Sequence, residues 1–235
     1  MPGRTIQVFL VDGTASGFRT AEIGLSTIKA VVVPRASLSG VAKRNELQRT
    51  GVYVLIGSDS ENPGEKKIYI GEGDTILSRL TTHNSDPEKD FWDEAVFFVS
   101  KDENLTKSHV RFLEARLISL AKEAKRATVT NGTSPPEHGK LPESATVEME
   151  EFIGQAKLLL GTLGYDFFEP APSLPSQTAE QNIAAAERLP KFFYSGDGFA
   201  ATCVVNVDSG QFIVQTGSEA RKLAIQALAP TYQTL

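Results

Sequence analysis

The stretch from 51 to 71, GVYVLIGSDSENPGEKKIYIG, constrains the fold more than any other part of the chain. Both of its halves alternate with the two-residue period of a β-strand. One face carries the aliphatic residues Val52, Val54, Ile56, Ile68 and Ile70. The other face carries Tyr53 and Tyr69, and the Asn-Pro-Gly between the halves is typical of a turn. We therefore expect an antiparallel hairpin with aliphatic residues on its core face and two phenols on the other.

Composition sets broad limits on the protein class. The chain has 235 residues, of which 40% are hydrophobic and 23% are charged, as in soluble globular proteins. The lone Cys203 excludes a disulfide framework and a cysteine-based zinc site. No apolar run approaches the roughly 20 residues that span a bilayer. The apolar N-terminal stretch is too short for a signal peptide, so we expect a cytoplasmic protein with no membrane partner.

Charge is unevenly distributed along the chain. The formal net charge is −5, but residues 1–48 carry 6 basic and 3 acidic side chains. Residues 49–134 carry 12 and 14, and residues 135–235 carry 6 and 12. A polyanion should therefore meet the first half of the chain, while the acidic second half faces elsewhere.

The N-terminal segment reads as two strands and a short helix. Strands are predicted at 5–11 and 29–34, with a Gly- and Thr-rich connection between them. A helix is predicted at 37–49, and it carries the basic residues Lys43 and Arg44 shortly before the hairpin. Two interpretations remain open for these cations: a solvated helix face or contact with a phosphate backbone.

A helix is also predicted directly after the hairpin, where Gly71 ends the second strand. Asp74 is a plausible N-cap. Arg79 and His83 lie four residues apart and so project from one face of this helix. They are either an exposed arginine and a helix-end histidine, or part of a site that includes the two tyrosines.

A strand is predicted at 95–100, and the clearest helix of the chain at 104–126. Glu114 falls on the apolar stripe of that helix. A carboxylate there costs several kcal/mol unless it is paired or binds a metal. The spacing alone leaves both readings open: a salt bridge to Arg111 or Arg79, or a metal ligand.

The remainder of the chain reads as a linker and a small β-rich module. Residues 128–144 are loop-like, with Asn131 opening an Asn-Gly turn. The predicted elements after it are an amphipathic helix at 146–168, a Pro- and Ser-rich linker at 169–180, strands at 192–195, 201–207 and 211–216, and a closing helix at 217–229 with Ser218 as its N-cap.

One arrangement covers residues 51–131: Gly-Val-Tyr, then Tyr-Ile-Gly, an Arg/His pair, a lone Glu and a later Asn. This order and spacing resemble the GIY-YIG nuclease family, with Val52 in place of the more usual Ile. The resemblance implies a small antiparallel sheet flanked by helices. It also implies divalent-metal-dependent hydrolysis of DNA, with Mg²⁺ or Mn²⁺ as the cofactor.

The resemblance assigns roles residue by residue. Tyr53 matches the proposed general base, with Tyr69 beside it, and Arg79 matches the arginine that binds the scissile phosphate. His83 matches a position that orients or activates water. Glu114 matches the metal ligand and Asn131 a polar residue that closes the site. Gly71 would let the backbone turn close beneath the phosphate, and Lys43 and Arg44 are further candidates for substrate binding. The sequence does not decide whether Tyr53 or His83 takes the proton.

The predicted class is α+β, in four parts. Residues 1–48 form an N-terminal β extension, 49–134 the nuclease-like domain, 135–180 a linker with an amphipathic helix, and 181–235 a β-rich module. That module is similar to a small domain of unnamed function found after such nucleases. The expected partner is DNA, and the oligomeric state stays open. The alternative is a non-catalytic nucleic-acid-binding or interaction module on the same scaffold, which the acidic net charge favours.

Overall fold

The computed structural model describes seven stretches of the chain: residues 3–58, 65–132, 141–170, 191–196, 199–206, 211–215 and 217–219. The chain divides into two compact units at Ala171 and Pro172. Each unit is described by itself.

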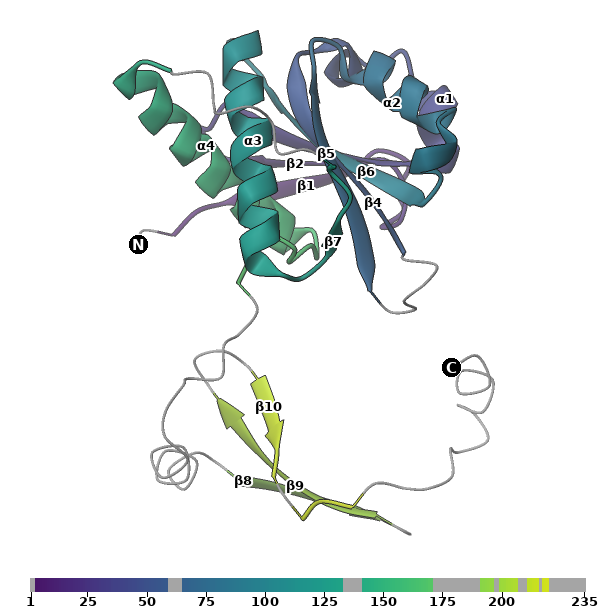
Figure 1. The fold of residues 1–235 in the computed structure, drawn as a ribbon, viewed down its shortest axis with the longest axis vertical. Coiled ribbons are helices and arrows are strands. Elements are labelled where there is room, and N and C mark those ends of the chain that lie inside the picture. The colour runs from purple at the N-terminus through teal and green to yellow at the C-terminus, as the bar shows by residue number, and fades with distance from the viewer. Residues whose placement is uncertain are drawn as a thin grey trace. The chain divides into compact units, whose positions relative to one another are not determined.

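The first unit is built on a seven-stranded sheet of order β1-β2-β3-β6-β4-β5-β7 (Figure 1). Its strands are β1 (Ile6–Leu10), β2 (Arg19–Ile23), β3 (Ile28–Pro34), β4 (Gly51–Ser58), β5 (Lys66–Gly73), β6 (Trp92–Ser100) and β7 (Thr128–Val129). All neighbours are antiparallel except β5 and β7. The predicted α+β class with a mostly antiparallel sheet is therefore confirmed.

Residues 1–48 supply three strands to this same sheet, because β3 pairs with β6 along its whole length. Strand β2 was not expected from the sequence, which reads there as a Gly- and Thr-rich connection. It pairs with β1 and β3 on either side. The strands from the N-terminal segment and those of the tyrosine hairpin thus share one hydrogen-bonded sheet.

Within the described residues of the first unit, the helices that flank the sheet are α1 (Leu38–Val41), α2 (Ile76–Asn84), α3 (Lys107–Ala124) and α4 (Glu143–Thr162). Short 3₁₀ helices in the same residues are η1 (Arg35–Ser37), η2 (Asn45–Gln48) and η3 (Pro87–Lys89). The prediction of a single helix at 37–49 is wrong. The segment forms η1, α1 and η2 in turn, and the extended backbone of Arg44, with φ −71° and ψ 138°, separates α1 from η2.

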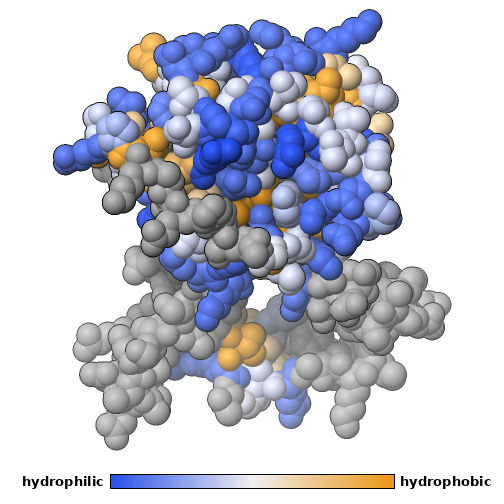
Figure 2. Space-filling model, turned by 45° about the horizontal axis from the view of Figure 1, so that its top comes forward, coloured by the Kyte–Doolittle hydropathy of each residue, from blue (hydrophilic) through white to orange (hydrophobic). Residues whose placement is uncertain are grey.

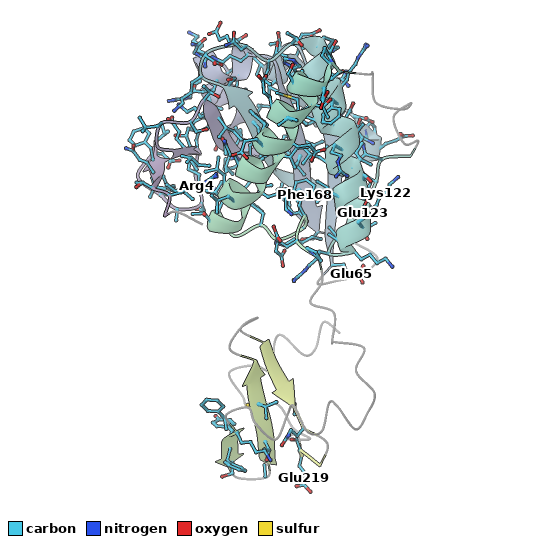
Figure 3. The ribbon with its side chains drawn as sticks, turned by 90° about the vertical axis from the view of Figure 1, so that its left-hand side faces the viewer. Arg4, Glu65, Lys122, Glu123, Phe168 and Glu219 are labelled. Carbon is cyan, nitrogen blue, oxygen red and sulfur yellow. The ribbon has the colours of Figure 1, made fainter. Side chains whose placement is uncertain are left out.

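The hairpin alternates as its sequence predicts. The register pairs Tyr53 with Gly71 and Leu55 with Tyr69. The aliphatic face packs into a core with α3 and α4, which lie side by side over that face of the sheet (Figures 1 and 3). The tyrosine face packs into a second core with α1, η2 and α2. Both faces of the central strands are therefore buried, as β4 shows, where every residue except the last, Ser58, is buried.

The face of the molecule seen in Figure 2 is mainly hydrophilic, with smaller apolar areas. Within the described stretches, no helix is both long enough and apolar enough to cross a membrane.

The second unit holds a three-stranded antiparallel sheet of order β10-β9-β8, made of β8 (Lys191–Gly196), β9 (Phe199–Asn206) and β10 (Gln211–Val214). The three strands predicted in the tail are confirmed. The closing helix predicted at 217–229 lies mostly outside the described residues, as does most of the predicted linker.

Candidate active site

Three aromatic side chains meet on the α2 side of the hairpin. Tyr53 comes from β4, Tyr69 from β5 and His83 from the last turn of α2. The Tyr53 hydroxyl lies 2.7 Å from His83 Nε2, and both side chains are buried. Ring centroids are 6.4 Å apart for the two tyrosines and 5.2 Å for Tyr69 and His83. Of the two interpretations that the sequence left open for His83, the structure therefore supports the one that places it with the two tyrosines.

Gly71 is the residue that makes this packing possible. A Cβ placed on Gly71 would lie 2.3 Å from the Tyr53 hydroxyl oxygen and 2.5 Å from its Cζ. Gly71 is buried within β5, which continues to Gly73, so it neither ends the strand nor lies at a turn beneath a substrate. Its lack of a side chain makes room for the Tyr53 ring against the neighbouring strand.

Arg79 lies one helical turn before His83 on α2 and is an exposed residue, with its guanidinium close to the buried Tyr53 hydroxyl. If Gly73 carried a Cβ, that atom would lie only 2.5 Å from Arg79 Cγ. The Arg79 side chain therefore runs close over the end of β5. The helix starts after Thr75 rather than Asp74, and Thr75 makes no side-chain cap. The closeness of the Tyr53 hydroxyl raises the pKa of Arg79, so the guanidinium is fixed as a cation beside the aromatic cluster.

Burial sets the protonation states of the cluster. Burial raises the pKa of Tyr53 well above its ordinary value and also raises the pKa of Tyr69. Burial lowers the pKa of His83, and the positive charges of Arg79 and Lys89 lower it further. At neutral pH both phenols are therefore protonated, and His83 is a neutral imidazole that can accept a proton.

Glu114 is half-buried on α3, and its carboxylate forms no ion pair or hydrogen bond within the described stretches. The salt bridge to Arg111 or Arg79 that the sequence left open is thus not formed. Arg111 and Lys107 instead lie 4.0 Å and 2.8 Å from the carboxylate of Glu72 on β5. Burial, and then the charge of Glu72, raises the pKa of Glu114 to about 7.

The aromatic cluster lies on the α2 face of the sheet, and the two carboxylates, Glu72 and Glu114, lie on the α3 face. The two sets approach each other at the edge formed by β5. Ile68, Ile70 and Glu72 point toward α3, whereas Tyr69 points toward α2. The parallel strand β7 pairs only with Lys67 and Ile68, so β5 has no strand partner on that side beyond them. The Glu114 charge acts on both tyrosines across this edge, raising their pKa values.

The carboxylates at this edge could bind a divalent cation that keeps most of its water ligands. They are too few to supply a complete protein coordination shell. In the described part of the chain, no group of three or more His, Cys, Asp or Glu side chains is placed to hold a metal. Mg²⁺ keeps several waters and is commonly held by one or two carboxylates together with substrate phosphate. The unpaired carboxylate of Glu114 meets the requirement for one carboxylate, whereas that of Glu72 is engaged by Lys107.

Asn131 lies at the same edge, but both ends of its amide are engaged. Its Nδ2 donates to the carbonyl of Ile70 at 2.7 Å, and its Oδ1 accepts from the Ile70 N–H at 3.0 Å. The side chain therefore completes the backbone hydrogen bonding of β5 where β7 has ended. This geometry is that of a structural clamp next to the cluster.

Lys43 and Arg44 do not join the cluster. Arg44 is 3.0 Å from the Glu46 carboxylate and stacks over the Phe18 ring at 4.8 Å. Lys43 is exposed, and within the described residues neither cation makes a hydrogen bond or ion pair with the cluster.

Sequence reasoning missed two charged residues of this edge. Glu72 follows Ile68 and Ile70 at the strand period, so alternation could have placed it toward α3 beside Glu114. Lys89 lies over the Tyr69 ring, with Nζ 4.3 Å from the ring centroid. It belongs to the irregular segment between α2 and β6, where no periodicity signals its direction.

Comparisons with protein-family models, with curated proteins and with solved structures find no match to this chain.

Proposed function

We propose that this protein is a divalent-metal-dependent endonuclease that hydrolyses phosphodiester bonds in DNA. The proposal rests on one observation: five side chains of the nuclease-like pattern gather at the edge of β5, namely Tyr53, Tyr69, Arg79, His83 and Glu114. Their types fit the chemistry, since a phosphodiester needs a cation for its charge and an acceptor for the proton of attacking water.

In this proposal Arg79 binds the scissile phosphate. Arg79 is an exposed residue whose guanidinium lies close to the Tyr53 hydroxyl, and it forms no ion pair with a carboxylate among the described residues. A planar fork of donors matches the oxygens of a phosphate and stabilises charge that develops there. Glu114 would hold Mg²⁺ or Mn²⁺, which when bound supplies Lewis-acid stabilisation of the phosphate.

The proton acceptor in this proposal is His83, acting through Tyr53. A buried phenol with a raised pKa is a poor base at neutral pH, whereas the neutral imidazole has the required proton affinity. When the Tyr53 oxygen takes the proton of water, its own proton passes over 2.7 Å to His83 Nε2. Negative charge then never rests on the phenol. At saturating Mg²⁺ or Mn²⁺, where the bound metal keeps Glu114 ionised, the rate of cleavage should rise with pH through a group that titrates below 6.5, the ordinary value for histidine, and not near 10.

The test is cleavage of plasmid, linear duplex, single-stranded and branched DNA, and RNA, with Mg²⁺ or Mn²⁺. Arg79→Ala should lower the rate by about 10²–10³-fold, as for loss of one donor to a developing oxyanion. Glu114→Gln should abolish activity. The matched controls are Arg116→Ala, which removes a surface pair with Glu150, and Glu123→Gln at the exposed end of α3 (Figure 3). Full activity in both site variants would overturn the proposal.

A non-catalytic nucleic-acid-binding or interaction module is the second candidate. The observation that favours it is burial: Tyr53 has no exposed surface and His83 only 7%. Under that reading the pair is a packing element, and the protein binds nucleic acid without cutting any substrate of the panel. Binding with no metal-dependent cleavage would support this candidate over the nuclease.

A further inference from the structure

The segment between α2 and β6 carries a cation that the nuclease-like pattern does not include. Lys89 ends η3, is partly buried, and holds its ammonium 4.3 Å from the centroid of the Tyr69 ring. Its charge reaches His83 as well, because it lowers the pKa of that imidazole. Lys89 and Arg79 therefore both act on the aromatic cluster, from different elements.

The segment is fixed in place by Arg35. The guanidinium donates to the Asn84 side chain at 2.9 Å and to the Asn84 carbonyl at 3.2 Å, just before the segment. It also donates to the carbonyls of Asp90 at 3.1 Å and Trp92 at 3.3 Å, just after Lys89. A single side chain thus ties both ends of the segment together, so the position of Lys89 over Tyr69 is set by the fold.

The acidic neighbours Asp86 and Asp90 form no ion pair with Lys89. The Asp90 carboxylate lies 2.9 Å from Arg35. The Asp86 carboxylate accepts from the Glu88 N–H at 3.0 Å, and its charge acts on Tyr69 and His83. In the described part of the chain, no carboxylate lies within ion-pair distance of the Lys89 ammonium. Lys107 on α3 differs, since its charge is balanced by Glu72 at 2.8 Å.

A stacked lysine is often no more than surface packing, with the ring face as its partner. Two features point beyond packing here. The ring it covers is a member of the proposed site, and the positive charge lacks a carboxylate partner next to an exposed arginine that lacks one too. Such a pair of cations attracts a polyanion, and the backbone of nucleic acid offers a row of phosphates.

We propose that Lys89 binds a backbone phosphate of the nucleic-acid substrate on the Tyr69 side of the site. This inference rests on the proposed function and adds a substrate-binding residue to it. Lys89 would contribute a point charge to binding, while Arg79 supplies the bidentate contact. Sequence preference would not change, because phosphate contacts are independent of the base.

The experiment measures binding to a fluorescein-labelled DNA duplex by anisotropy, in EDTA so that no cleavage occurs, over a series of salt concentrations. For Lys89→Gln, the slope of log K against log salt should fall in magnitude by about 0.9, the loss of one phosphate contact. Lys89→Arg should restore the slope, and thermal melting verifies that each variant is folded. The matched control is Lys66→Gln, which removes an exposed lysine that covers Tyr165 at 5.8 Å.

Two results would overturn the inference while leaving the nuclease proposal in place. One is an unchanged slope for Lys89→Gln. The other is an equal fall in the magnitude of the salt slope for Lys66→Gln, which would show that loss of any surface lysine has this effect. If the wild-type protein neither binds nor cuts any substrate of the panel, the proposed function itself fails, and the role of Lys89 fails with it.

Discussion

Gly71→Ala tests the packing on which the candidate site depends. The added methyl would lie 2.5 Å from Tyr53 Cζ, whereas ordinary contact begins at 3.4 Å, so the ring must move by about 0.9 Å. The ring is rigid and fully buried, and it cannot swing aside as a flexible chain end would. Overpacking of a core by one methyl costs about 1–3 kcal/mol.

The displaced ring also endangers its hydrogen bond. A shift of that size would stretch or bend the 2.7 Å contact between Tyr53 and His83 Nε2 beyond useful geometry. If the buried Tyr53 hydroxyl and His83 imidazole are left poorly paired, the unfolding free energy falls by about 1–3 kcal/mol more. We expect Gly71→Ala to lose about 2–6 kcal/mol of unfolding free energy in all, which corresponds to a fall in Tm on the order of 10 °C for a domain of this size.

The assay is urea unfolding followed by circular dichroism, with Gly154→Ala as the matched control. A Cβ on Gly154 in α4 meets no atom within 4 Å, so the same chemical change there should stabilise the protein by about 0.5–1 kcal/mol. The reasoning is refuted if Gly71→Ala unfolds at the same urea concentration as the wild type.

Three further predictions follow from the charges and hydrogen bonds of the site. Because the folded pKa of Glu114 is raised to about 7, its ionisation destabilises the metal-free fold as pH rises. Glu114→Gln should therefore be more stable than the wild type at about pH 8 and lose that advantage in acid, and Mg²⁺ or Mn²⁺ should raise the Tm of the wild type only. Because the folded pKa of His83 is depressed, its contribution to stability should be present above 6.5 and decline as pH falls through the lower folded pKa. NMR titration of the imidazole and urea unfolding across that range measure this, and an imidazole that titrates above 6.5 would contradict it. Asn131→Ala should cost about 1–3 kcal/mol in unfolding free energy by leaving both polar groups of Ile70 unpaired, and a variant as stable as the wild type would argue against the clamp.

Local periodicity was enough to predict the elements of the site. Alternation placed Tyr53 and Tyr69 on one face of a hairpin, and helical spacing placed Arg79 and His83 on one face of α2. The period of α3 placed Glu114 on a half-buried stripe. These predictions hold because strand and helix periods are properties of the backbone and can be read from a few consecutive residues.

Contacts between distant segments were decided only by the tertiary structure. The ring of Tyr53 fixes the role of Gly71. Glu72 pairs with Arg111, one of the two cations that the sequence offered as a partner of Glu114. Asn131 turns to the backbone of Ile70 because β7 ends at Val129, opposite Ile68, and does not reach Ile70. None of these outcomes has a local signature, since each depends on which unsatisfied groups the fold brings together.

What the sequence determined by itself was therefore a hairpin, its flanking helices and the residue types on which the proposed phosphodiester chemistry rests. The tertiary structure decided which of those residues are buried, which are neutralised and which remain charged at the open edge of β5. The physical reason is that protonation and pairing depend on desolvation and on nearby charge. Both are set by segments far apart in the chain, as the approach of Lys89 to Tyr69 shows.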